Sequence, residues 1–176
     1  LPRIMKEAFH IARTGRPGPV LIDIPVDILQ SEVMEDFAYP SRVNIVGYKP
    51  RVSGHPLQIR RAAQALRQAQ RPVLCAGGGV LSAHAQPLLA ALAERLDVPV
   101  IHTMMGVGVL PASHPLSLGM LGTYGVPSAN YALYHADVVM LIGARVGDRA
   151  VASANQLSDN AKVIHIDVDP AEIGKN

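Results

Sequence analysis

Residues 72–79 read Pro-Val-Leu-Cys-Ala-Gly-Gly-Gly, a short apolar run that ends in three glycines. A run of this length between turn residues is typical of a strand that is buried on both faces of a sheet. Similar runs occur at residues 138–142, before Gly143, and at residues 163–166, before Asp167. Because helical patterns separate them, we predict an α/β fold: an open, mostly parallel, Rossmann-like sheet with helices on both faces.

The flanking sequence predicts further elements. Apolar residues at helical spacing indicate helices at residues 4–12, 57–69, 87–96 and 128–135. Residues 98–102 predict a strand, and residues 19–25, an apolar run bounded by prolines, predict another strand buried on both faces. The glycine-rich stretch 103–127 predicts a long functional loop. Asp169 and Pro170 are typical of the cap and first turn of a helix.

The pattern changes in residues 31–55, where periodicity is lost and Pro, Gly and acidic residues accumulate. We interpret this stretch as a linker between residues 1–30, the tail of one domain, and residues 56–176, a nucleotide-binding-type domain. The chain starts at Leu1, without Met and within an expected helix, and stops where another helix begins. We therefore expect it to be an internal piece of a longer protein.

The composition bounds the class of protein. The 49% of hydrophobic and 17% of charged residues are typical of a globular protein with a buried core. The length of 176 residues predicts one such domain plus part of a second. A net charge of +2 with scattered basic residues argues against nucleic-acid or membrane partners. The single cysteine, Cys75, lies in an apolar run, where we expect a small buried hydrophobe; it fits a reducing, cytoplasmic location. The seven histidines show no metal-ligand spacing, so no metal site is predicted.

Chemically useful residues follow three predicted strands: Gly77–Gly79, Gly143-Ala144-Arg145 and Asp167-Val168-Asp169. Ligands of such sheets bind at the carboxyl ends of the strands. Glycine permits close backbone approach, arginine binds phosphate, and a carboxylate accepts from ribose hydroxyls. The three strand ends together therefore predict a nucleotide site. Each has a plainer interpretation as well, because the glycines could only form a tight turn and the charged residues could be solvated loop residues.

Beyond these patterns, the sequence resembles the large subunit of acetolactate synthase, a thiamine-diphosphate-dependent enzyme. The similarity follows the family's order along essentially the whole chain. It is carried by residues 15–25, 71–73, 77–80, 114–116, 119–122, 129–132, 143–145, 148–149, 164–167 and 171–176.

The resemblance implies a three-domain enzyme that decarboxylates a 2-oxo acid and forms a C–C bond, in branched-chain amino-acid biosynthesis. Residues 1–30 would be the tail of the N-terminal, pyrimidine-binding domain, and residues 56–176 most of the central domain. Thiamine diphosphate and Mg²⁺ would bind outside this chain, which would hold no catalytic residue and be inactive alone. A homo-oligomer is implied, with a small regulatory subunit as a further candidate partner.

The resemblance also implies FAD in the central domain. The expected contacts come from the strand ends, the loop after residue 102, and one residue of the first domain. They are Gly77, Gly78 and Gly79 near the cofactor backbone; Thr103, Met104 and Met105 lining it; Gly143, Ala144, Arg145 and Arg149 near the phosphates and flavin; Asp167, Val168 and Glu172 around the adenosine; and Arg16.

Some positions differ from the family's usual residues, namely Val26, the pair Thr123-Tyr124, and Gly147. Benzaldehyde-lyase-, glyoxylate-carboligase- and 2-hydroxyacyl-CoA-lyase-like enzymes therefore stay open as alternatives. A stand-alone nucleotide-binding module without catalysis is the non-enzyme alternative.

Overall fold

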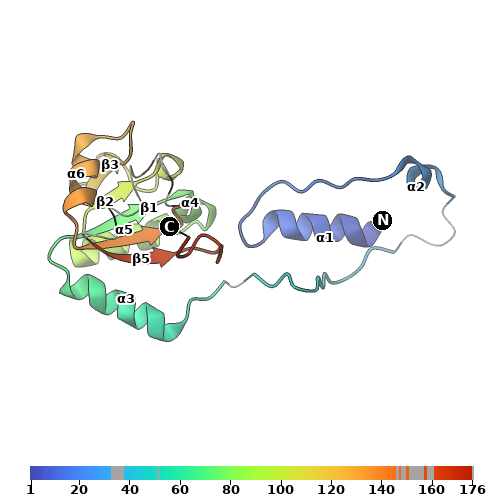
Figure 1. Ribbon diagram of the computed structural model, residues 1–176, viewed down its shortest axis with the longest axis horizontal. Helices are drawn as coiled ribbons and strands as arrows, with labels where there is room; N and C mark the ends of the chain where they lie inside the picture. Colours follow the sequence, from blue (N-terminus) through green and yellow to red (C-terminus); the bar gives the residue numbers. More distant parts are fainter. Residues whose placement is uncertain are drawn as a thin grey trace. The chain divides into compact units, whose positions relative to one another are not determined.

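The computed structural model describes residues 1–32, 38–50, 52–145, 147, 150, 157 and 161–175. The chain divides into two compact units, Leu1–Ser53 and Gly54–Asn176. Figure 1 draws the helices and strands of both units and labels most of them. None of the described helices is long and apolar enough to cross a membrane.

The second unit is built on a sheet of five parallel strands. The chain starts at the centre of the sheet with β1 and moves outward to β2 and β3. It then crosses to the other side of β1 to form β4 and finally β5, so the strand order is β3-β2-β1-β4-β5. The strands are β1 (Pro72–Ala76), β2 (Val100–His102), β3 (Ser117–Met120), β4 (Val138–Ile142) and β5 (Lys162–Ile166). This arrangement confirms the predicted α/β fold class and puts the reversal of strand order between β1 and β4.

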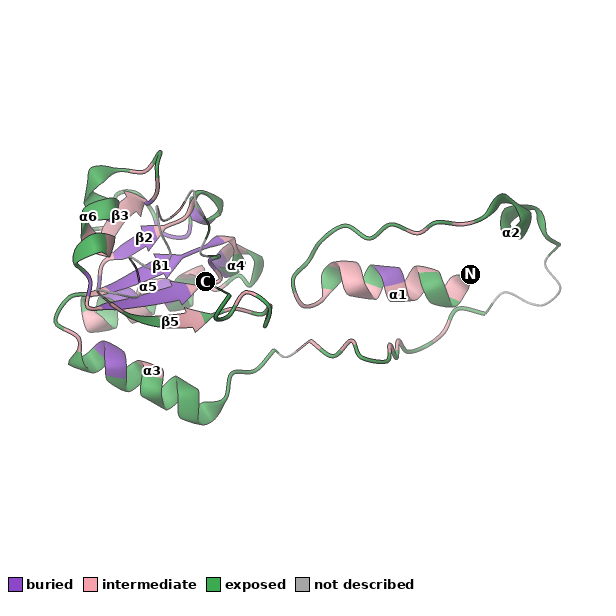
Figure 2. Ribbon diagram, in the orientation of Figure 1, coloured by how far each residue is buried: buried purple, intermediate pink, exposed green. Residues whose placement is uncertain are grey.

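Helices cover both faces of this sheet because side chains alternate along each strand. Leu74 and Ala76 of β1 belong to the core under α3 (Pro56–Gln68), α4 (Gly78–Ser82) and α5 (Gln86–Leu96). Val73 and Cys75 belong to the opposite core, under α6 (Pro127–His135). In Figure 2 the buried residues accordingly gather on the inner strands, whereas the outer sides of the helices are exposed.

Two elements of this unit were not predicted. Strand β3 lies inside the stretch that we expected to be a loop; it contains Gly119 at φ +93°, and its register with β2 shifts between Val100 and Ile101. A strand with an internal glycine has a weak sequence signal. Helix α4 begins at Gly78, and its glycines argue against a helix by propensity alone.

The helix expected after β5 is absent from the described residues. The carboxylate of Asp169 accepts a hydrogen bond from the amide of Ala171 at 3.0 Å, as a helix cap would. Residues 170–173 nevertheless form turns. The prediction of a helix capped by Asp169 is therefore wrong for the described residues, where the Asp169 carboxylate closes a turn instead.

The first unit contains α1 (Pro2–Arg13) and α2 (Val26–Gln30). The Tyr48 hydroxyl donates to the carbonyl of Thr14 at 2.9 Å, which ties the segment 38–50 to the end of α1. The predicted strand at residues 19–25 is wrong: this run is extended but unpaired, and Leu21 is 92% exposed. A buried strand needs hydrogen-bonding neighbours and cover on both faces, and the described residues of this unit form no sheet.

Candidate nucleotide-binding site

The loops that follow β1 and β4 meet at the carboxyl edge of the sheet. The two strands pair up to Ala76 and Ile142. Beyond them, the amide of Gly77 donates to the carbonyl of Ile142 at 2.9 Å, and the amide of Gly79 donates to the carbonyl of Gly143 at 3.0 Å. The two loops are therefore joined by backbone hydrogen bonds at the point where the strand order reverses.

This junction explains why glycine occupies three of its positions. A Cβ on Gly77 would lie 2.1 Å from the carbonyl oxygen of Gly143, and one on Gly79 would lie 2.7 Å from the Gly143 Cα. Gly143 itself has φ +55°, in the left-handed region that favours glycine. The glycines are thus required by contact between two backbones. Their approach to a cofactor, expected from the sequence, stays a prediction.

The loop after β2 adds exposed apolar side chains to the same edge. The amide of Thr103 donates to the carbonyl of Ala76 at 3.0 Å, which fixes the start of this loop. A short 3-10 helix, η1 (Met104–Gly106), follows. Within it, Met104 and Met105 are 77% and 72% exposed. Adjacent exposed apolar side chains beside a ligand edge are suited to contact a flat ring system.

The turn after β4 presents a cation. Ala144 is buried in the core under α6, whereas the next residue, Arg145, is exposed. The amide of Gly143 donates to the carbonyl of Ile166 at 2.8 Å, which continues the β4–β5 pairing into the turn. A guanidinium held at the end of a fixed turn is suited to bind phosphate oxygens.

Acidic residues follow β5. One carboxylate oxygen of Asp167 accepts from the amide of Asp169 at 2.9 Å, forming a local turn. Its other oxygen lies 3.9 Å from Nε2 of His165, and both side chains are only 10% exposed. Glu172 lies 3.5 Å from the ammonium of Lys175. The local turn thus uses one carboxylate oxygen of Asp167, and the other is the oxygen nearer to His165.

Two predicted site residues are not brought to this edge by the described structure. Arg16 is an exposed residue of the first unit, so its predicted contact with the second unit stays untested. Arg149 lies outside the described residues. The other predicted positions all lie in the segments that directly follow β1, β2, β4 and β5.

His165 was not among the predicted site residues, yet the structure brings its side chain to the turn after β4. Its Nε2 lies 3.0 Å from the carbonyl oxygen of Ala144. A signal was available in the sequence, because His165 and Asp167 are two residues apart at a strand end and so share one face.

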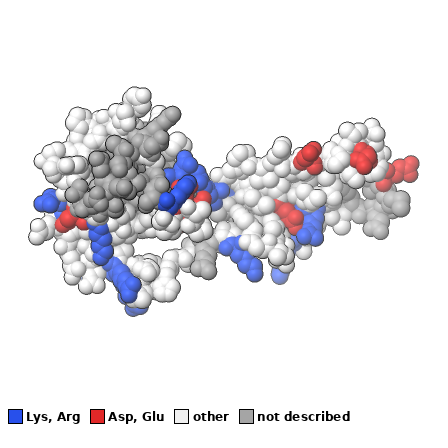
Figure 3. Space-filling view, in the orientation of Figure 1, with Lys and Arg blue, Asp and Glu red and all other residues white. Residues whose placement is uncertain are grey.

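Other chemistry receives no support from the described residues. Burial raises the pKa of the Cys75 thiol to about 12, so the group is protonated and shielded at neutral pH. No three His, Cys, Asp or Glu side chains of the described part lie together in a way that could hold a metal ion. In the face drawn in Figure 3, acidic and basic side chains are scattered among uncharged ones.

An open parallel sheet whose strand order reverses beside its first strand defines the class of doubly wound, nucleotide-binding-type domains. Comparison with known families makes the assignment specific. Residues 59–176 match the family described as "Thiamine pyrophosphate enzyme, central domain", and the chain belongs to this family.

Several named relatives are similar over the whole chain, and their names confirm the resemblance. The probable acetolactate synthase large subunit of Methanocaldococcus jannaschii is 48% identical over 177 residues, which cover 100% of this chain and 30% of the relative. The acetolactate synthase of Arthrospira platensis is 48% identical, covering 100% and 31%. The acetolactate synthase large subunit of Corynebacterium glutamicum is 45% identical, covering 99% and 28%. The chain thus spans about 30% of the length of these relatives.

Proposed function

We propose that this chain is part of a longer, thiamine-diphosphate-dependent carboligase of the acetolactate synthase type, called the full-length protein below. That enzyme decarboxylates a 2-oxo acid such as pyruvate and joins the product to a second carbonyl group. The observation that carries the proposal is the extent of the similarity: identities of 45–48% run through the entire chain, including the residues before 59, where the family match begins.

The proposal assigns each part of the chain. Residues 1–30 are the tail of the pyrimidine-binding domain, 31–55 the linker, and 56–176 the central domain. The exposed apolar run at residues 19–25 supports this assignment, because the rest of that domain would cover these side chains. Thiamine diphosphate and Mg²⁺ bind outside this chain.

The proposed enzyme is a cytoplasmic homo-oligomer whose substrates are small 2-oxo acids. A small regulatory subunit is a further proposed partner, because the relatives from M. jannaschii and C. glutamicum are named large subunits. Light scattering tests the assembly: a fully active monomer would contradict it.

We further propose that the carboxyl edge of the sheet binds FAD. The described residues fit this group, since exposed Met104 and Met105 can contact the ring system and exposed Arg145 the phosphates. Asp167 supplies a carboxylate for a ribose hydroxyl. A bound flavin brings a redox-active ring, and carboligation requires no net electron transfer from it. The residues of this chain therefore act by binding and orienting.

The activity is tested with the full-length protein supplied with thiamine diphosphate, Mg²⁺ and pyruvate. We expect acetolactate, detected after acid conversion to acetoin, and no product from residues 1–176 alone. Glyoxylate, benzaldehyde and 2-hydroxyacyl-CoA are tested in parallel. Turnover of one of these without acetolactate formation would favour the corresponding relative, and the absence of any carboligation would contradict the proposal.

A further inference from the structure

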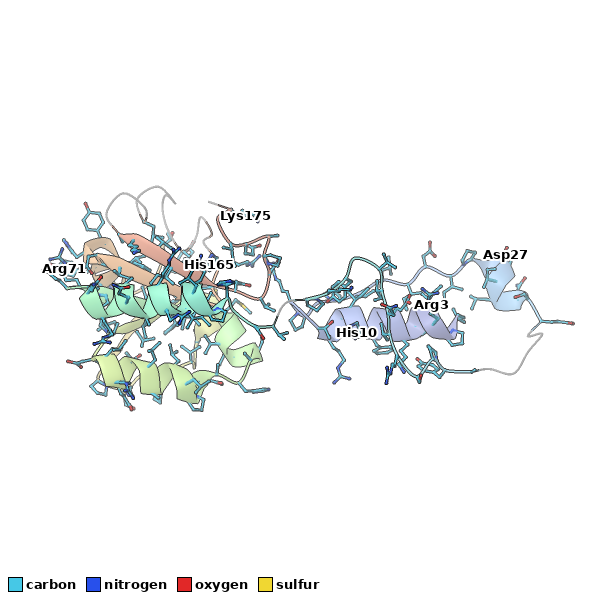
Figure 4. The ribbon with its side chains drawn as sticks, turned by 90° about the horizontal axis from the view of Figure 1, so that it is seen from below. Arg3, His10, Asp27, Arg71, His165 and Lys175 are labelled. Atoms are coloured by element: carbon cyan, nitrogen blue, oxygen red, sulfur yellow. The ribbon has the colours of Figure 1, made fainter. Side chains whose placement is uncertain are left out.

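We propose that His165 is a positioning residue of the strand-end site: its side chain fixes the turn 143–145 and so directs Arg145 toward the phosphates of a bound nucleotide. This inference rests on the proposed nucleotide site and names a residue that controls it. His165 lies near the end of β5, where the chain continues toward Lys175 (Figure 4).

The ring of His165 donates a hydrogen bond to the turn after β4. His165 Nε2 lies 3.0 Å from the carbonyl oxygen of Ala144. Because a carbonyl oxygen can only accept, Nε2 must carry a hydrogen and donate it. The competing acceptor, Asp167, has its nearer oxygen 3.9 Å from the same nitrogen, too far for a hydrogen bond. The donor of His165 is therefore committed to Ala144.

The bond from His165 adds a third attachment to the turn 143–145. The amide of Gly143 donates to Ile166, and the carbonyl of Gly143 accepts from the amide of Gly79. Both bonds hold the turn at its first residue. The bond from His165 holds the next residue, Ala144, and so fixes the peptide unit that leads directly into Arg145.

Both partners of this hydrogen bond are largely buried. The His165 side chain is 10% exposed, and Ala144 belongs to the core under α6. Leu141 of β4 is the register partner of His165 in the sheet and is also buried. Polar donors at such buried positions in folded proteins almost always make a hydrogen bond. Without that donor, the carbonyl of Ala144 would lose this hydrogen bond and the turn could change direction.

The test compares His165→Leu with His165→Gln in the full-length protein. Leucine keeps apolar volume but removes the donor, whereas glutamine keeps an N–H donor at about the reach of Nε2. ADP binding is measured by calorimetry for wild type and both variants. Hydrogen exchange of peptides spanning residues 141–145 is measured without ligand.

We expect His165→Leu to weaken ADP binding about tenfold or more and to accelerate exchange in the turn, and His165→Gln to restore both to within about threefold of wild type. If the leucine variant binds ADP as wild type does, or if glutamine fails to rescue a folded protein, the inference is overturned. If wild type binds neither ADP nor FAD, the proposed site fails instead. The exchange data then still decide whether His165 holds the turn.

Discussion

Gly79 and Gly143 approach each other so closely that neither position has room for a side chain. A Cβ on Gly79 would lie 2.7 Å from the Cα of Gly143, and a Cβ on Gly143 would lie 2.6 Å from the Cα of Gly79. The hydrogen bond from the Gly79 amide to the Gly143 carbonyl spans the same contact at 3.0 Å. The loops after β1 and β4 thus form one unit at the point where the strand order reverses, and the proposed ligand edge is built on it.

Alanine at Gly79 should therefore destabilise the second unit. The added methyl group meets backbone rather than a movable side chain, so the strands must separate, at a cost of about 2–3 kcal/mol. Native-state hydrogen exchange of β1 and β4 peptides in the full-length protein measures this local stability. The control is Gly147→Ala, because a Cβ there meets nothing within 4 Å. Equal protection in the two variants would contradict the prediction.

A second junction lies at the opposite, amino-terminal end of the sheet. The carboxylate of Asp137 accepts from the amides of Gln70 and Arg71 at 2.7 and 2.9 Å. The Asp137 amide in turn donates to the carbonyl of Arg71 at 3.2 Å. Asp137→Ala removes both side-chain acceptors and should cost about 1 kcal/mol of local stability, measured by exchange in β1 and β4.

The same carboxylate predicts a pH dependence. Desolvation raises its pKa, but the hydrogen bonds from Gln70 and Arg71 and the Arg71 charge outweigh this, so the pKa of Asp137 lies below its usual value. The contribution of Asp137 to stability is therefore complete above the pKa that it has in the unfolded chain, about 3.9. It is lost as the pH falls through the lower pKa that it has in the folded protein. The stability difference between wild type and Asp137→Ala should shrink below about pH 4. A difference that grows on acidification would refute this assignment.

Cys75 should be chemically inert in the folded protein. Its pKa, raised by burial to about 12, leaves almost no thiolate at pH 8. We expect the peptide carrying Cys75 to be unlabelled by iodoacetamide in the native full-length protein and labelled in urea, as read by mass spectrometry. Rapid native labelling would show that the core of β1 is accessible.

The sequence predictions were most accurate for elements whose apolar side chains are buried by other parts of this same chain. The predicted strand at residues 138–142 agrees with β4 because it is central and paired on both sides. Residues 19–25 have the same local pattern, yet they form no strand among the described residues, because pairing partners cannot be read from one segment. Strand β3 and helix α4 were missed because glycine obscured the local signal.

The sequence predicted that the candidate residues converge at one edge of the sheet, but it did not predict the contacts between them. Parallel topology brings the ends of β1, β4 and β5 to one edge, so the convergence of Gly77, Gly143 and Asp167 followed from the order of elements. Sequence could not distinguish glycines needed for a ligand from glycines needed for a neighbouring backbone. It also could not show that His165 donates to Ala144, because that contact joins residues 21 positions apart.

Asp167 should favour nucleotides with a free ribose hydroxyl. Asp167→Asn keeps an oxygen for the amide of Asp169 but removes the charge, so it should preserve the turn while reducing rejection of a 2′-phosphorylated ligand. Asp167→Ala removes both functions and should weaken ADP binding by about 1–3 kcal/mol. Calorimetry with ADP and with 2′-phospho-ADP measures the two effects. An unchanged preference in the asparagine variant would contradict the role of the charge.

Within the proposed thiamine-diphosphate-dependent carboligase, the carboxyl edge of the sheet in residues 56–176 should bind FAD. The most direct measurement is the flavin content of the full-length protein, purified without added cofactor, denatured, and assayed for fluorescence in the supernatant, followed by titration of the apoprotein with FAD. We expect released flavin or saturable rebinding of FAD, with rebinding weakened in Arg145→Ala. A colourless protein that also fails to bind added FAD would contradict it.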